Sequence, residues 1–249
     1  MSREADIERF YSLLNRLEQQ VGGKRQLATL TNIQNLPVRG VYFFFEPGEN
    51  RTHSGTGQRV IRVGTHALTA SSRSTLKQRL RNHRGLESGG GNHRGSIFRL
   101  LVGMALLGRG GLGACPSWGI KGDADRAALA LKCSPGEIKT KEERIEQAVT
   151  KYLGTMSFVW LAVSDDAGPN SLRGVIERNS IALLSNLNAE PIDPPSNGWL
   201  GRFSDRPLVR ESGLWNQRHV EDEYDAKFLD RLEQLMEPNG PSAGPIYPS

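Results

Sequence analysis

Apolar residues at helical spacing alternate along this chain with short, continuous apolar runs. The helical spacing first occurs over 6–21, where Phe10, Leu14 and Leu17 lie three or four residues apart and Gly22 follows. The same spacing predicts further helices over 74–83, 96–107, 141–153, 172–185 and 225–236.

The continuous apolar runs predict three strands, over 39–46, 59–64 and 157–163. A polar loop, 47–58, rich in Gly, Thr and Ser, separates the first two runs and predicts that they form a β-hairpin. We therefore expect an α/β fold: a small, mainly antiparallel central sheet flanked by helices, with an N-terminal helix and a C-terminal extension.

Changes in composition along the chain predict how it is divided. Residues 108–140 are rich in glycine and predict an irregular insertion, and 238–249 are rich in Pro and Gly and predict disorder. The predicted parts are an N-terminal helical extension over 1–36, a central domain over 37–203, a C-terminal helical extension over 204–237 and the tail.

The charge of the chain favours an anionic partner. The net charge is +5 and the pI is about 9.4, a small excess for 249 residues. The distribution says more, because 59–99 contains many Arg, Lys and His residues and a single acid, Glu87. A basic segment of this kind is suited to binding phosphate groups.

Cysteine content and hydropathy predict a cytoplasmic protein that does not enter a membrane. Cys115 and Cys133 are too few for a disulfide framework and lack metal-ligand spacing with any histidine. No apolar run is long enough to span a membrane, and the N-terminus lacks the pattern of a signal peptide.

Candidate chemistry begins with Arg79 and His83, which lie four residues apart on a predicted helix and so share one face. Arginine presents a planar fork that matches phosphate oxygens, and histidine can transfer protons near neutral pH. Earlier in the chain, Tyr42 lies in the first predicted strand and Gly64 ends the second.

This order of residues resembles the GIY-YIG nuclease superfamily, discontinuously over 39–197. The resemblance implies that Tyr42 is the general base or positions the attacking water, that Arg79 binds the scissile phosphate, and that His83 matches a histidine of some branches. It further implies an endonuclease that needs Mg²⁺ or Mn²⁺ and acts on nucleic acid, with double-stranded DNA as the expected partner.

The resemblance also implies a metal ligand. In this family a glutamate on the helix after the third strand holds the metal, and Glu177 occupies that place in a run of the form Glu-x-x-x-Ile-x-x-Leu. One carboxylate together with substrate phosphate suits a cation that keeps several waters. Glu146 is the alternative, although it precedes the third strand.

The chain departs from the family pattern at two places. Arg62 stands where the second motif has a tyrosine, and His66, just past that strand, is a further candidate for contact with nucleic acid. The late asparagine of the family could be Asn186, Asn188 or Asn197, and we favour Asn197.

A glycine-rich segment, 89–95, predicts a second phosphate-binding element. Glycines allow close approach of the backbone, and the segment leads into a helix N-terminus at Ser96, which favours anions. His93 and Arg94 lie beside it. The alternative is a flexible linker with incidental charges.

Two functions of different class follow. The first is a metal-dependent endonuclease, which the joint presence of Tyr42, Arg79, His83 and Glu177 favours. The alternative is a nucleic-acid-binding module that retains the nuclease fold without cleavage, which Arg62 favours. A small-molecule or protein-interaction domain has only the modest net charge in its favour.

Overall fold

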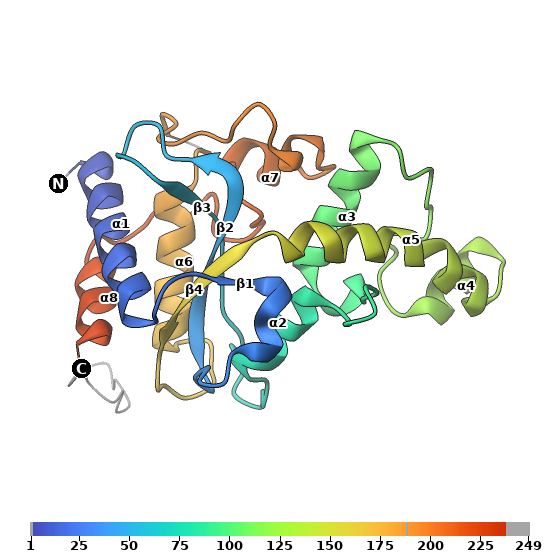
Figure 1. The fold of residues 1–249 in the computed structure, drawn as a ribbon, viewed down its shortest axis with the longest axis horizontal. Helices are drawn as coiled ribbons and strands as arrows, with labels where there is room; N and C mark the ends of the chain where they lie inside the picture. Colours follow the sequence, from blue (N-terminus) through green and yellow to red (C-terminus); the bar gives the residue numbers. More distant parts are fainter. Residues whose placement is uncertain (1, 188, 238–249) are drawn as a thin grey trace.

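A computed structural model describes residues 2–187 and 189–237. A four-stranded antiparallel sheet lies at its centre, in the order β1-β4-β2-β3 (Figure 1). Its strands are β1 (Arg25–Gln26), β2 (Gly40–Asn50), β3 (Gln58–Gly64) and β4 (Ser157–Ala162). The predicted α/β fold with a mainly antiparallel sheet is confirmed.

The predicted hairpin is also present, and its register places the first candidate residues. In β2 and β3, Tyr42 pairs with Gly64 and Phe44 with Arg62. Side chains alternate between the faces of a strand. Tyr42 and Phe44 therefore enter one apolar core, whereas Val41 and Phe43 enter the other.

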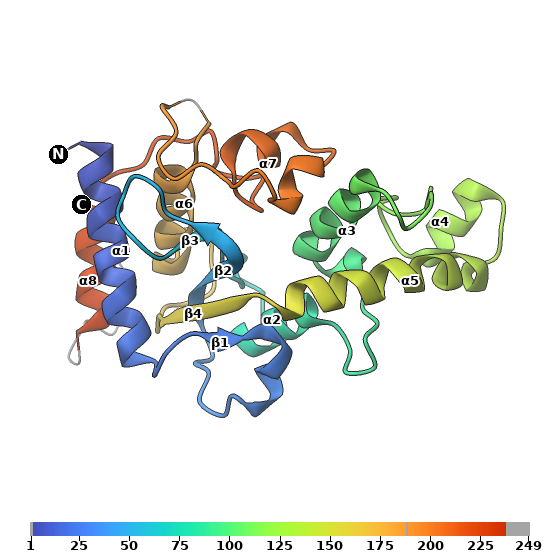
Figure 2. The same cartoon turned by 45° about the horizontal axis from the view of Figure 1, so that its top comes forward.

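Helices cover both faces of the sheet (Figure 2). One core lies under α1 (Arg3–Gln20), α6 (Leu172–Leu184) and α8 (Phe228–Met236). The opposite core lies under α2 (Leu76–Arg84), α3 (Ile97–Arg109) and α5 (Pro135–Gly154). Because α1 and α8 share their core with the sheet, the predicted extensions pack directly on the central unit.

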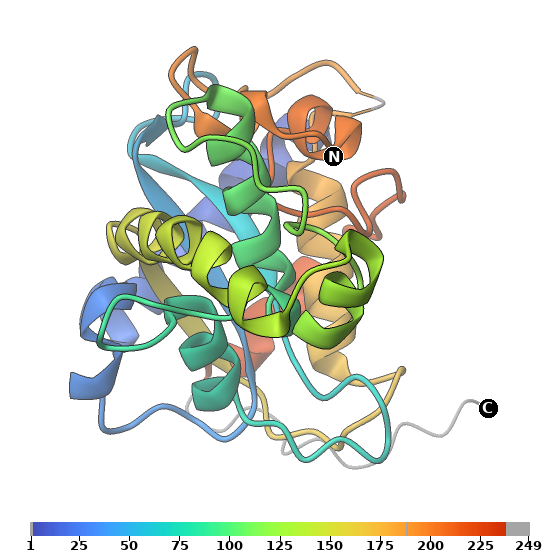
Figure 3. The same ribbon diagram turned by 90° about the vertical axis from the view of Figure 1, so that its right-hand side faces the viewer.

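The prediction that residues 108–140 are irregular is wrong in part. The stretch contains α4 (Ala124–Leu131) and the first turns of α5, which lie together at one end of the molecule in Figure 1, the end that faces the viewer in Figure 3. Asp123 caps α4, and Ser134 with Glu137 forms a capping box that starts α5. The apolar face shared by these helices is small, so hydrophobic spacing gave little sign of them.

The remaining elements are short. They are the 3₁₀ segments η1 (Leu27–Asn32), η2 (His93–Gly95) and η3 (Leu200–Phe203), and helix α7 (Pro207–Ser212). The last predicted helix begins at Phe228 and not at Asp225.

The predicted disordered tail lies outside the described residues. None of the described helices is both long and apolar enough to cross a membrane, and the expected cytoplasmic location stays a prediction.

Candidate functional site

Tyr42 lies at the centre of the candidate site, on β2. Its ring crosses the end of β3 so closely that a Cβ atom at Gly64 would come within 2.3 Å of the phenol oxygen. Only glycine permits this approach, which explains the glycine at the end of β3. The phenol oxygen lies 2.8 Å from Nε2 of His83, and both side chains are fully buried.

His83 comes from the last turn of α2 and connects Tyr42 to the next helix. Its Nδ1 atom lies 2.7 Å from the hydroxyl of Ser96, which also caps the N-terminus of α3. Burial lowers the pKa of His83 well below its ordinary value, and the positive charges of Arg79 and Arg62 lower it further. The imidazole is therefore neutral at physiological pH.

Arg62 and Arg79 give this region an excess of positive charge. The buried guanidinium of Arg62 lies 4.7 Å from the centre of the Phe98 ring and donates to the carbonyl of Trp215. Arg79 is half-buried on α2. Within 2–187 and 189–237, neither arginine forms an ion pair. Their charge is thus free to act on a bound anion.

Glu177 approaches the same region from α6. Its Oε1 accepts a hydrogen bond of 3.1 Å from the backbone N–H of Thr65, just after β3. Arg173, one turn earlier, donates 2.9 Å to the carbonyl of His66 and fastens this segment to α6. Burial raises the pKa of Glu177, against the opposing charge of Arg62. Tyr42 thus contacts His83, and the positive charges of Arg62 and Arg79 act on both His83 and Glu177.

Glu177 offers a carboxylate oxygen to a divalent cation. No described residue donates to Oε2 of Glu177, which keeps contact with solvent. The described residues contain no group of three or more His, Cys, Asp or Glu side chains placed to hold a metal. One free carboxylate oxygen fits a Mg²⁺ ion that keeps most of its waters and shares substrate phosphate.

His66 and the candidates for the late asparagine have surroundings of their own. His66 is buried, its Nδ1 lies 2.9 Å from the carbonyl of Ser74, and burial lowers its pKa to about 4. Asn197 is exposed, and Asn186 is bound within its own loop through the N–H of Ile192. Asn188 lies outside the described residues. Contact of His66 with nucleic acid stays a prediction, and so does the choice of Asn197 as the late asparagine of the family.

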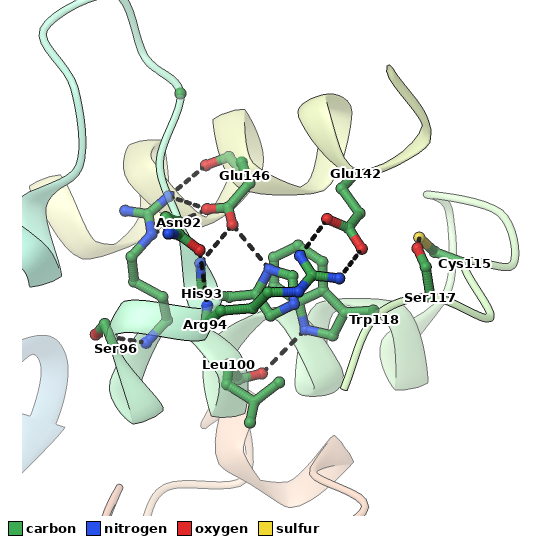
Figure 4. Close-up of polar contacts among 12 residues, drawn as sticks. Asn92, His93, Arg94, Ser96, Leu100, Cys115, Ser117, Trp118, Glu142 and Glu146 are labelled. Carbon is green, nitrogen blue, oxygen red and sulfur yellow. Dashed lines mark hydrogen bonds and ion pairs between the residues drawn. The ribbon is translucent and has the colours of Figure 1, made fainter. Parts of the chain in front are cut away.

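His93 and Arg94 lie in a separate network (Figure 4). Oε1 of Glu146 accepts from the backbone N–H and Nδ1 of His93, at 2.6 and 2.9 Å. Arg94 forms a bidentate pair with Glu142 at 2.6 and 2.7 Å, and the His93 ring stacks on Trp118 at 3.8 Å. These contacts give both side chains a structural role, and their contact with phosphate stays a prediction.

Glu146, the alternative metal ligand, is fully engaged in that network. Its Oε2 accepts two bonds from Arg99, at 2.9 and 2.5 Å, while Oε1 is taken by His93. A metal would have to displace both Arg99 and His93, so Glu177 is the better ligand of the two.

Three residues of the region were missed as site residues: Thr65, Ser96 and Asn216. Asn216 pairs with both backbone groups of Val63 on β3, at 3.2 and 2.9 Å. The helix start at Ser96 is visible in the sequence, but its contact with His83 spans 13 positions between two helices and leaves no local signal.

Comparison with known proteins agrees with the fold. No curated protein and no solved structure matches the chain. The family described as the GIY-YIG domain matches it over residues 1–241, nearly its whole length. The chain therefore belongs to the GIY-YIG domain family, whose members are typically nucleases that use a divalent metal.

Proposed function

We propose that this protein is a divalent-metal-dependent endonuclease that hydrolyses phosphodiester bonds in nucleic acid, with double-stranded DNA as substrate. One observation carries the proposal: among the described residues Arg62 and Arg79 have no carboxylate partner in an ion pair, and the charges of both act on Glu177 and on His83, which is hydrogen-bonded to Tyr42. A structural ion-pair network would neutralise those charges, whereas a site for a phosphate and a cation needs both signs close together.

Arg79 is the proposed phosphate-binding residue. It is the more accessible of the two arginines, and its planar fork suits two phosphate oxygens. Arg62 lies deeper and adds positive charge where the family has a tyrosine. A groove of about 540 Å³ lies beside the end of α2 and is lined in part by Arg81 and Arg84. It offers room for the nucleic-acid backbone next to the phosphate that Arg79 would bind.

Tyr42 is the proposed proton acceptor for the attacking water, and His83 holds its oxygen at 2.8 Å. Glu177 would hold Mg²⁺ or Mn²⁺ through its free Oε2. When bound, the ion supplies Lewis-acid stabilisation of the leaving oxygen.

A non-catalytic nucleic-acid-binding module is the second candidate. The observation in its favour is that Tyr42 and His83 are both fully buried, although general acid–base groups must reach the substrate or a water. Such a module would bind duplex DNA through Arg79, Arg81 and Arg84 and leave it intact.

Incubation with supercoiled plasmid in Mg²⁺, in Mn²⁺ and in excess chelator separates the two functions. We expect nicked or linear product only with a divalent cation. Glu177→Gln should lower the cleavage rate about a hundredfold or more, because Lewis-acid help is worth several kcal/mol, and leave DNA binding nearly unchanged.

The matched control is Glu143→Gln, the same change at an exposed glutamate of α5. It should cleave at the wild-type rate. Full activity in chelator would overturn the metal role, and tight binding without any cleavage under all three conditions would establish the binding module.

A further inference from the structure

We propose that Arg173 is a positioning residue for the metal site, because it holds the chain segment that orients the carboxylate of Glu177. The segment is 65–67, directly after β3. Arg173 and Glu177 lie four residues apart on α6 and so share one face of that helix. The inference rests on the proposed metal role of Glu177, although its tests do not require cleavage.

Segment 65–67 is bound to α6 through both kinds of backbone group. The N–H of Thr65 donates to Oε1 of Glu177 at 3.1 Å. The carbonyls of His66 and Ala67 accept from the guanidinium of Arg173, at 2.9 and 3.3 Å. Two side chains one helical turn apart therefore hold three consecutive residues of the segment.

Ala67 shows why the segment needs to be held. Its φ is 56°, in the left-handed region that is unfavourable for a residue with a Cβ atom. The two carbonyls that Arg173 binds belong to the peptide units before and after the Cα atom of Ala67. We therefore expect the segment to relax to other conformations when the guanidinium is lost.

Asp165 fixes Arg173 in turn. Its Oδ1 lies 2.5 Å from Nε of Arg173, and its Oδ2 accepts from the backbone N–H of Arg173 at 3.0 Å. Arg173 is fully buried and Asp165 is nearly so. A guanidinium in such a buried pair has little freedom, so the carbonyls it binds are fixed as well.

The hydrogen bond from Thr65 gives the two oxygens of Glu177 different tasks. Oε1 is held by the backbone, which sets the direction in which Oε2 can meet a cation. Groups that orient a metal ligand from outside typically change metal affinity about 10–100-fold when they are lost. Disturbing the segment that carries this N–H should therefore weaken metal binding.

Charge alone does not predict this weakening. Arg173 carries a positive charge that acts on Glu177, and a cation beside the site repels a metal ion. If charge were its only contribution, Arg173→Lys would leave the affinity unchanged and Arg173→Gln would strengthen it. Weaker binding in both variants is the mark of positioning.

Electron paramagnetic resonance of free Mn²⁺, titrated into the full chain without nucleic acid, measures this affinity. We expect Glu177→Gln to lose the site. Arg173→Lys should weaken Mn²⁺ binding about tenfold, since a lysine lacks the fork that reaches both carbonyls. The matched control is Arg99→Lys, the same change at an equally buried arginine that pairs with Glu146. It should bind Mn²⁺ as the wild type does.

Hydrogen exchange of the wild-type protein tests the held segment without any substitution. The N–H of Thr65 should exchange as slowly as the amides inside β3, because its partner is fixed on α6. Fast exchange, as in a free loop, would overturn the proposal. In Arg173→Lys the N–H of Thr65 should lose protection, whereas in Arg99→Lys it should keep it.

The outcomes are distinct from failure of the proposed function. Weaker Mn²⁺ binding by Arg173→Lys, in a protein that cleaves nothing, would support the positioning role and refute the nuclease. Equal Mn²⁺ affinity in Arg173→Lys, Arg99→Lys and the wild type would refute the positioning role, whether or not the protein cleaves. Mn²⁺ binding that Glu177→Gln does not change would overturn the metal site and the positioning role together.

Discussion

Two buried histidines, His83 and His93, show how the same residue types serve different ends in this molecule. His83 contacts two hydroxyl groups, of Tyr42 and Ser96. His93 instead contacts the carboxylate of Glu146 and stacks on Trp118. Both histidines have arginines nearby. The difference lies in whether carboxylates balance the positive charge of those arginines.

Near His93 each arginine has its own acid, whereas near His83 positive charge is in excess. Arg94 pairs with Glu142 and Arg99 with Glu146. A cavity of about 870 Å³ beside this network has an excess of acids in its lining, with Asp123, Asp125, Glu142, Glu143 and Glu146 against Arg94 and Lys139. Such a surface repels nucleic acid, so the excess of cations at His83 marks the region suited to a phosphate.

The largest expected effect is at Arg79. Arg79→Ala should lower single-turnover cleavage about a hundredfold or more, because a donor aimed at the transition-state phosphate acts on the chemical step. The salt dependence of binding should change by about one phosphate contact.

The control is Arg81→Ala on the same helix, at an exposed position that lines the groove. It should change the salt dependence of binding similarly and leave the saturated rate near wild type. If Arg79→Ala binds weakly yet cleaves normally at saturation, Arg79 only positions the substrate.

A third buried histidine, His66, predicts how the free energy of unfolding depends on pH. Its pKa of about 4 lies below the ordinary value of 6.5, first because of burial. The unfolded chain therefore binds more protons between these values, and the free energy of unfolding falls as pH drops from 6.5 towards 4. The loss should reach up to about 3 kcal/mol.

Denaturant unfolding of wild type and His66→Gln across this pH range measures the effect. The variant should show a smaller loss of stability on acidification. His53→Gln, at an exposed histidine, should follow the wild type. Identical pH dependence in all three proteins would show that His66 does not set it.

The smallest effect on rate is expected at Arg94. Arg94→Ala leaves the mostly buried Glu142 without its partner and should lower the free energy of unfolding by about 1–2 kcal/mol. Cleavage at saturating enzyme should stay within about threefold of wild type. Binding titrations at several salt concentrations would reveal the phosphate contact predicted for this loop, as weakened binding with a shallower salt dependence.

Much of the fold could be predicted from the sequence because its signals are local. Aromatic and β-branched runs around Tyr42 and Val60 mark the hairpin, and capping residues such as Ser96 mark helix starts. The short α4 was missed because its apolar face is small, Ala127 and Ala128 with Ile138 of α5. Local propensity does not reveal a helix whose place in the fold depends on a few contacts with another element.

For the candidate site, the sequence indicated the residues but not their partners. The family order of Tyr42, Arg79 and His83 was visible, and the structure places these residues together. Glu146, whose carboxylate contacts His93, lies 53 positions away on another helix, so the sequence could not show that His93 is already engaged. Only the three-dimensional neighbours distinguish an engaged side chain from a free one.

Single-turnover cleavage by His83→Gln and His93→Gln, measured beside their unfolding free energies, tests the central claim most directly. Both changes remove a fully buried imidazole and should lower stability. We predict that His83→Gln loses cleavage about a hundredfold or more, in the range of a lost acid–base group, whereas His93→Gln cleaves near the wild-type rate once saturated. Equal loss in both variants, or normal cleavage by His83→Gln, would contradict the account.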